Sequence, residues 1–380
     1  MKKYATQICT VSDQVDANLL PILKKEIRPD NVVLLVTDQM QATADRLQNS
    51  IQDLVKVSRY RVKDINNIRQ IQELLLQVNI SLEDESDVMV NITGGNKPSC
   101  IACYQYCVDQ QIPYFYIDKN GHYQSGVGKD IEEGELSFRL TEKEFNRYVQ
   151  AHGYKILDTE TTLSPRVADH KDEFFSFVLN GQLKSQSVAQ LNWCAAEAYP
   201  SLNVKVSERS EEFDALLDQL ERFGWVTYKG STLHFVNEAC RDFLNGKWLE
   251  VYLQEVLQEA LGGVKIYRGL TFGTNQSNKH FKNEFDLVFW YNNKVHVFEV
   301  KTSKLNAADN AKQNVIHKLT QLTENFGGLT AHPALISYQP LCPELAARAQ
   351  DSQVGVFAGH CLMNRQQLIG KLKQWINQDV

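Results

Sequence analysis

The first 120 residues alternate short apolar runs with segments of helical period, and this alternation constrains the fold more than any other feature. Short runs rich in β-branched and aromatic residues predict buried strands. Strands that alternate with helices predict a parallel sheet covered on both faces, as in a Rossmann-like α/β domain. We place this domain at residues 1–140. Its predicted strands are Ala5–Val11, Asn31–Thr37, Tyr60–Lys63, Asp87–Thr93 and Pro113–Ile117, and its predicted helices are Gln41–Val57, Ile65–Val78 and one that begins at Lys97.

Residues 141–245 have a different pattern, in which helical periods dominate. An acidic helix is predicted at Glu211–Phe223, and a two-stranded hairpin with Lys229-Gly230 at its turn follows it. This order predicts a winged-helix-like connector. Many winged helices bind DNA, but a structural spacer or a dimerisation element is an equal alternative. The negative charge of the helix argues against its approach to phosphates.

Residues 246–380 return to a mixed α/β pattern, which predicts a third domain. Its predicted helices are Lys247–Ala260, Asn306–Asn325 and Arg365–Gln378, and its predicted strands are Val264–Arg268, Glu284–Trp290, Val295–Lys301 and the segments PALISY and VGVFAG. Within Gly246–Lys304, eight Lys and Arg residues stand against six Asp and Glu residues, although the whole chain has a net charge of −6. This local excess of positive charge favours contact with phosphates more than the overall charge does.

The sequence lacks the apolar core of a signal peptide near its start and any apolar run of the ~18 residues that span a bilayer. Eight cysteines in 380 residues are too sparse for a disulfide framework. We therefore expect a soluble, cytoplasmic protein with no membrane partner.

Two carboxylates are predicted to meet on adjacent strands of the third domain. Asp286 lies on the first strand and Glu299 on the second, and Lys301 projects from the same face as Glu299. Because Mg²⁺ and Mn²⁺ prefer carboxylate and carbonyl oxygens, we predict Asp286, Glu299 and the Val300 carbonyl as metal ligands. Lys301 would orient the attacking water or neutralise the phosphate, and Glu250 on the preceding helix is a fourth catalytic candidate.

A simpler alternative is a hairpin that carries an ordinary Glu–Lys pair. Polar side chains on the core strands of an α/β domain are costly unless they are paired or bind a metal, which favours the metal site. The order of these residues in Gly246–Asn325 resembles the PD-(D/E)XK nuclease superfamily, although Phe285 replaces the Pro of the motif. The resemblance implies a restriction-endonuclease-like fold and metal-dependent phosphodiester hydrolysis. It also places Gln313 where some members carry a supporting polar residue.

A glycine-rich turn, Thr93–Ser99 (TGGNKPS), joins a predicted strand of the first domain to a predicted helix. Two glycines allow a ligand to approach the backbone, and the start of the helix offers unpaired N–H groups to a phosphate. Lys97 adds a positive charge there. The carboxyl ends of parallel strands are where doubly wound sheets bind ligands, which favours a binding site over a plain turn. The first strand is not followed by G-x-G-x-x-G, which argues against a nicotinamide or flavin site.

This turn, together with the segment SDQVDANL after the first strand, resembles the CARF domains of type III CRISPR accessory proteins. The order of three domains resembles the CARF nucleases that cyclic tetra-adenylate activates. The resemblance implies a homodimer, a cyclic oligoadenylate bound across its two-fold axis, and a single-stranded DNA or RNA substrate. By the same resemblance, the ligand contacts would be Thr10, Ser12, Asn18, Thr37, Asp38, Thr93, Gly94, Gly95, Asn96 and Lys97.

Two other functions remain open on the sequence. One is a DNA-repair or restriction-type nuclease whose first domain binds another nucleotide or none. The other is a regulator without enzymatic activity, in which the connector binds DNA. The presence of Asp286, Glu299 and Lys301 argues against an inactive third domain, and the acidic connector helix argues against a DNA reader.

Overall fold

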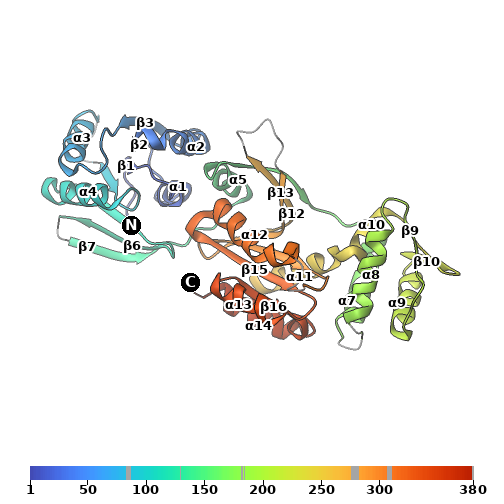
Figure 1. Cartoon of the computed structure of the whole chain (residues 1–380). Helices are drawn as coiled ribbons and strands as arrows, with labels where there is room; N and C mark the ends of the chain where they lie inside the picture. The colour runs from blue at the N-terminus through green and yellow to red at the C-terminus, as the bar shows by residue number, and fades with distance from the viewer. Residues whose placement is uncertain are drawn as a thin grey trace.

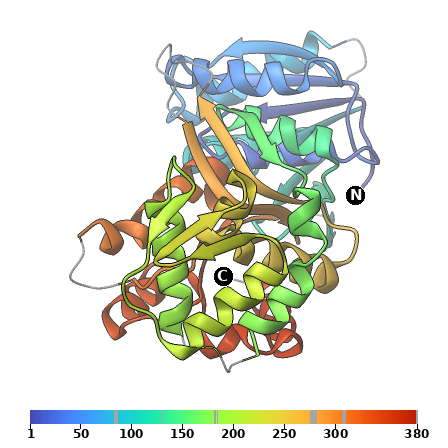
Figure 2. The ribbon, with the colours of Figure 1, turned by 90° about the vertical axis from the view of Figure 1, so that its right-hand side faces the viewer.

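The computed structural model describes residues 1–82, 87–128, 130–180, 183, 185–274, 282–305 and 310–378. The side chain of Gln313 lies outside the described residues, as do those of residues 310–312. In Figure 1 the C-terminal α/β domain lies between the N-terminal domain and the helical connector, although the connector separates these two domains in the sequence. Figure 2 views the molecule from the connector side.

The N-terminal sheet has the strand order β3-β2-β1-β4-β5-β6-β7, and β1 to β5 are parallel. Helices α1 and α2 pack on the face that carries Cys9 and Leu34, and α3 and α4 pack on the face that carries Ile8 and Leu35. The predicted doubly wound fold is therefore confirmed. The elements are β1 Thr6–Thr10, α1 Asp16–Leu23, β2 Asn31–Val36, α2 Gln41–Ile51, β3 Lys56–Arg61, α3 Ile68–Ile80, β4 Val88–Asn91, α4 Lys97–Gln110, β5 Tyr114–Ile117, β6 His122–Val127 and β7 Asp130–Glu135.

The boundary between α2 and β3 differs from the prediction. The helix expected at Gln41–Val57 ends at Ile51, and β3 begins at Lys56 rather than at Tyr60. Strand β3 lies at the edge of the sheet, and its exposed charged residues alternate with half-buried ones. Such a strand continues the amphipathic pattern of the helix before it, so the pattern alone did not separate the two. Helix α1 and the hairpin β6–β7 were also not predicted.

The connector contains the three-stranded sheet β10-β11-β9 and the helices around it. The predicted acidic helix is α9, and the predicted hairpin is β10–β11, which turns between Lys229 and Thr232. These elements confirm the winged-helix-like pattern. Their bounds are α6 Pro165–Ala168, α7 Lys171–Val178, α8 Ser185–Glu197, β9 Asn203–Lys205, α9 Glu211–Arg222, β10 Val226–Lys229, β11 Thr232–Phe235 and α10 Glu238–Asp242, followed by a π-helical turn at Phe243–Lys247.

The C-terminal sheet has the order β16-β15-β14-β13-β12-β8. The hairpin β13–β14 turns at Asn292-Asn293, both with positive φ (48° and 59°), as a tight hairpin of this kind requires. Strand β8 lies between α5 and the connector in the sequence, yet it pairs with β12 at the edge of this sheet. The elements are α5 Glu142–Ala151, β8 Tyr154–Glu160, α11 Trp248–Leu261, β12 Ile266–Thr274, β13 Lys282–Tyr291, β14 Lys294–Lys301, α12 Asn310–Gly327, β15 Ala331–Ser337, α13 Pro343–Asp351, β16 Gly355–Ala358 and α14 Arg365–Ile376.

Each face of the C-terminal sheet shares a hydrophobic core with a neighbour. Helices α11 and α14 cover the face of Leu287 and Phe298, and their core continues into the connector. The core on the other face contains Phe285 and Val297 and continues into α1 and α2 of the N-terminal domain. The three parts therefore share hydrophobic cores and do not pack as independent domains. No helix in the described ranges is long and apolar enough to cross a bilayer.

Candidate nuclease site and nucleotide-binding turn

The register of the hairpin β13–β14 places Asp286 and Glu299 together. The strands pair from Tyr291 with Lys294 to Leu287 with Phe298, and Asp286 and Glu299 each lie one residue beyond the last pair. There the Val300 N–H donates to Asp286 Oδ2 at 2.6 Å. The carboxylate therefore occupies the space between the two strands as their ladder ends.

The Lys301 ammonium brings together the three oxygen atoms that the sequence predicted as metal ligands. Lys301 Nζ lies 2.5 Å from Glu299 Oε1 and 3.6 Å from Asp286 Oδ2. It donates to the Val300 carbonyl at 3.1 Å. Three hard oxygens thus converge on one positive charge, which is the arrangement that a Mg²⁺ or Mn²⁺ ion needs. Within the described residues, no three His, Cys, Asp or Glu side chains form a ready metal site, so carbonyl and water oxygens would complete the shell.

Negative charge exceeds positive charge in this cluster. Burial raises the pKa of Asp286 to about 6, Glu299 raises it further, and Lys301 opposes the rise. Burial also raises the pKa of Glu250 on α11 to about 9, with further contributions from Asp286 and Glu160. Although burial acts against it, the pKa of Lys301 is raised by Asp286 and Glu299. A divalent cation would relieve the repulsion among these carboxylates, so the site fits the metal that the donor set implies.

Three charged residues beside the cluster were missed by the sequence analysis. Glu160, at the end of β8, forms an ion pair with Lys247 and lies 3.4 Å from Arg268 Nε. Lys247 directly precedes α11, the helix that carries Glu250. Recognising β8 as a strand of the C-terminal sheet would have been the only signal for Glu160, because its neighbours along the chain belong to the junction.

The glycine-rich turn lies against the end of β1, at the point where the strand order of the N-terminal sheet reverses between β1 and β4. A Cβ atom at Gly94 would lie 2.7 Å from the Thr10 carbonyl, and one at Gly95, where φ is +102°, would lie 2.3 Å from Ser99 Oγ. Asn18 on α1 donates to the same Thr10 carbonyl at 2.9 Å. The two glycines are therefore required by close packing of the turn against β1.

The helix that follows the turn starts with a capped first turn. Asn96 Oδ1 accepts from the Ser99 N–H at 3.0 Å, and Asn96 Nδ2 donates to Asn66 Oδ1. Thr93 Oγ1 accepts from the Ile117 N–H at 3.0 Å. The side chains of Thr93 and Asn96 therefore shape the turn, while that of Lys97 is exposed.

The remaining predicted ligand residues divide into two groups. The Ser12 hydroxyl, which follows β1, is buried without a hydrogen-bond partner among the described residues, so it could bind an incoming polar group. Asp38, after β2, instead forms a two-pronged ion pair with Arg61 at 2.6 and 2.8 Å. Its neighbour Thr37 precedes a short 3-10 turn. The described contacts link Asp38 to β3 and not to the glycine-rich turn.

Comparisons with known protein families find a match for the N-terminal domain and another for the C-terminal domain. Residues 6–145 match the family model described as Card1 CARF domain, and residues 237–377 match the model described as Card1-like, endonuclease domain. A search of curated proteins finds no significant match.

Three solved structures share the fold. Protein VC1899 from Vibrio cholerae is 19% identical, with a TM-score of 0.84, over 98% of this chain and 97% of that chain. Can2 from Sulfobacillus thermosulfidooxidans, solved with cyclic tetra-adenylate, is 23% identical, with a TM-score of 0.80, over 99% and 98%. A type III CRISPR defence DNA nuclease activated by cyclic oligoadenylate is 16% identical, with a TM-score of 0.53, over 90% of this chain and 47% of that chain.

The fold and the two family matches define a nuclease that carries a CARF domain at its N-terminal end. Its N-terminal domain belongs to the Card1 CARF family, and its C-terminal domain belongs to the Card1-like endonuclease family.

Proposed function

We propose that this protein is a metal-dependent endonuclease that cleaves single-stranded DNA or RNA when cyclic tetra-adenylate binds at the interface of two CARF domains. It would act in the cytoplasm, in type III CRISPR antiviral defence. The observation that carries the proposal is the convergence of Asp286, Glu299 and the Val300 carbonyl on one positive charge, in a chain whose other end is a CARF domain.

Asp286, Glu299 and the Val300 carbonyl would hold Mg²⁺ or Mn²⁺. The ion would lower the pKa of the attacking water and stabilise the charge that develops on the phosphate. Lys301 contacts all three of these groups, so its ammonium would lie next to the ion and bind the water or a phosphate oxygen. Burial and Asp286 raise the pKa of Glu250 to about 9, and a cation bound nearby would lower it again, so Glu250 is a further candidate for the catalytic set.

The activator would bind at the glycine-rich turn. The backbone at Gly94 and Gly95 approaches β1 closely, the Ser12 hydroxyl is buried without a partner among the described residues, and Lys97 is exposed at the start of α4. A helix start of this kind binds phosphate. The support from relatives is the CARF family match and the solved complex of Can2 with cyclic tetra-adenylate.

A cyclic ligand with two-fold symmetry requires two copies of the turn, and therefore a dimer. Helices α3 and α4, which pack together and flank the turn, expose large apolar side chains. Ile80 is 65% exposed, Ile101 47%, Leu76 46% and Tyr104 42%. Exposed apolar side chains of this size on two adjacent helices favour an interface with a second copy.

Replacement of Lys97 by Ala separates activator binding from cleavage. A hydrogen bond to a charged group is worth about 1.5–3 kcal/mol, so we expect the activator Kd to rise about 10- to 100-fold. The cleavage rate at saturating activator should stay near that of the parent, because the catalytic carboxylates are unchanged. Calorimetry measures the Kd, and a cleavage assay with Mn²⁺ on single- and double-stranded DNA and RNA measures the rate and the substrate class.

Lys56→Ala is the matched control, because Lys56 is exposed at the amino end of the edge strand β3, whereas the turn lies at the carboxyl end of the central strand β4. This variant should bind activator like the parent, and light scattering should give twice 43.4 kDa for both. Cleavage by the parent that is independent of cyclic tetra-adenylate would favour a repair or restriction-type nuclease. Parental binding by the Lys97 variant would show that the turn is not the activator site.

A further inference from the structure

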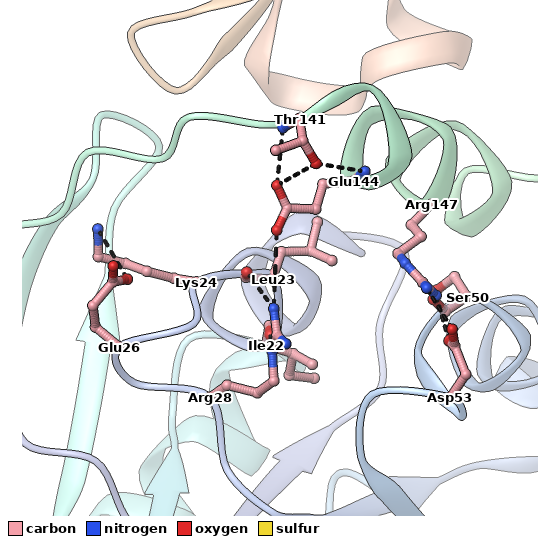
Figure 3. Close-up of polar contacts among 10 residues, drawn as sticks. All are labelled: Ile22, Leu23, Lys24, Glu26, Arg28, Ser50, Asp53, Thr141, Glu144 and Arg147. Atoms are coloured by element: carbon pink, nitrogen blue, oxygen red, sulfur yellow. Dashed lines mark hydrogen bonds and ion pairs between the residues drawn. The ribbon is translucent and has the colours of Figure 1, made fainter.

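Helix α5, which follows the sheet of the CARF domain in the sequence, is bound to that domain by ion pairs and a hydrogen bond. Figure 3 shows these contacts. Arg147 donates to the Ser50 carbonyl at 2.7 Å and forms an ion pair with Asp53, at the end of α2. Nearer the start of α5, Glu144 Oε1 lies 3.9 Å from Arg28 Nη2. The Arg147 side chain is only 9% exposed, so its two partners hold a buried charge that would be costly to separate.

The strand after α5 belongs to the nuclease sheet. Only His152 and Gly153 separate α5 from β8, so a shift of the helix moves the strand with it. Strand β8 pairs with β12 from Tyr154 opposite Thr274 to Glu160 opposite Arg268. The pairing shifts register on both sides of Thr271, and Glu160 lies beyond these shifts at the far end of β8.

Glu160 contacts two cations beside the catalytic carboxylates. Its carboxylate forms an ion pair with Lys247 and lies 3.4 Å from Arg268 Nε, and the Arg268 side chain is 4% exposed. Lys247 precedes Glu250 by three residues, so the two lie about one helical turn apart. The position of Glu160 therefore constrains the first turn of α11, which carries Glu250.

We propose that Glu160 is a positioning residue for the nuclease site. Its contacts with Lys247 and Arg268 fix the position of the start of α11 relative to β8. Strand β8 continues from α5, and α5 is bound to the CARF domain by ion pairs and a hydrogen bond. A conformational change in the CARF domain would therefore change the position of β8 and of the start of α11. The inference rests on the proposed function and adds a physical route from the activator site to Glu250.

Glu160→Gln removes the charge of Glu160 and keeps its size. We expect the activator Kd to stay within about twofold of the parent, because the variant leaves the CARF domain unchanged. The maximal activated rate should fall about 10- to 100-fold with little change in KM, as small misplacements of catalytic groups produce. Glu160→Asp, which keeps the charge, should recover part of the rate. A purely structural role would lower thermal stability in both variants and give no such recovery.

The matched control is Asp158→Asn, two residues earlier on β8. Asp158 is exposed, and its side chain accepts a hydrogen bond from the N–H of Thr159. It should cleave like the parent. If Glu160 acts through Lys247, the double variant Glu160→Gln/Lys247→Met should lose no more rate than the more damaged single variant.

The outcomes distinguish the two proposals. A parent that fails to cleave with Mn²⁺ and cyclic tetra-adenylate contradicts the proposed function itself. A parent that cleaves on activation while Glu160→Gln cleaves equally fast overturns the role of Glu160 alone. Fully additive losses for Glu160→Gln and Lys247→Met overturn the route through Lys247.

Discussion

Two acidic clusters in this molecule contain similar groups but differ in charge balance. The nuclease cluster combines Asp286, Glu299 and Glu250 with one ammonium, that of Lys301. The second cluster, which we term the junction cluster, contains Asp16 on α1, Tyr148 and His152 on α5, and Thr330 just before β15. It joins the CARF domain to the nuclease domain.

The junction cluster surrounds its one carboxylate with partners from the protein. Thr330 donates to Asp16 Oδ2 at 2.9 Å and Tyr148 at 3.5 Å, and His152 Nε2 lies 3.3 Å from Asp16 Oδ1. Burial raises the pKa of Asp16, as it raises that of Asp286. The next largest cause differs in sign: His152 lowers the pKa of Asp16, whereas Glu299 raises the pKa of Asp286 further.

This difference supports a structural role for the junction cluster and a ligand-binding role for the nuclease cluster. The Asp16 carboxylate has hydroxyl donors on one oxygen and the His152 imidazole 3.3 Å from the other, so the protein itself supplies its neighbours. A cluster in which carboxylates repel one another would be stabilised by a bound cation, which supports the proposed metal site. The comparison predicts that changes in the nuclease cluster act on catalysis and metal binding, while changes in the junction cluster act on stability.

The largest expected effect is on cleavage. Asp286→Ala or Glu299→Ala removes a proposed metal ligand, so cleavage should fall by at least ~10²–10⁴ and become undetectable in most assays. Activator binding should be unchanged, since the CARF domain is untouched. Single-turnover cleavage with Mn²⁺ measures the loss, and EDTA should produce the same loss in the parent. Undiminished cleavage by the Glu299 variant would place the active site elsewhere.

The second prediction concerns metal and stability. An ion that binds only the folded protein stabilises it by about 2.7 kcal/mol at a hundredfold excess over its Kd. We expect Mn²⁺ to raise the Tm of the parent, and we expect Glu299→Gln to remove most of this rise. Glu324→Gln, an exposed change on α12, is the control that should keep it. If Mn²⁺ stabilised the Glu299 variant and the parent equally, the nuclease cluster would not be the metal site that distinguishes it from the junction cluster.

The smallest expected effect is at the junction. Asp16→Ala removes one of the acceptors of the Thr330 and Tyr148 hydroxyls, which retain the Gly327 carbonyl, and the carboxylate beside His152. This change should cost about 1–3 kcal/mol of stability. Denaturant unfolding measures this loss, and Asp13→Ala, an exposed change three residues earlier, should show almost none. Mn²⁺ should stabilise the Asp16 variant as much as the parent. A variant that instead loses its metal response would show that the clusters are not independent.

Much of the fold could be predicted from the sequence because its signals are local. Alternating runs predicted β1, β2, β4 and β5 of the CARF sheet, and two apolar runs around a turn predicted at Asn292-Asn293-Lys294 indicated β13–β14, although Lys294 already pairs within β14. The α2–β3 boundary was wrong, because an edge strand with exposed charges has no burial pattern that distinguishes it from the end of a helix. The catalytic roles of Glu250, Asp286, Glu299 and Lys301 and the ligand contacts at Thr93–Lys97 remain predictions.

By itself the sequence determined which side chains could meet at the end of one hairpin. Glu299 and Lys301 are two residues apart, and their common face follows from strand geometry alone. The register of a two-residue turn brings Asp286 to the same end. These relations span a few residues, so no distant part of the chain is needed to establish them.

The tertiary structure alone decided how the two ends of the chain are connected. Glu160 meets Lys247 across 87 residues, and Asp16 meets Thr330 across 314. Such contacts depend on which edge of a sheet a strand joins and on how domains pack, and neither is encoded in a local pattern of burial. In the sequence, β8 belongs to the region assigned to the connector. In the structure it joins the nuclease sheet, because it pairs with β12 at the edge of that sheet.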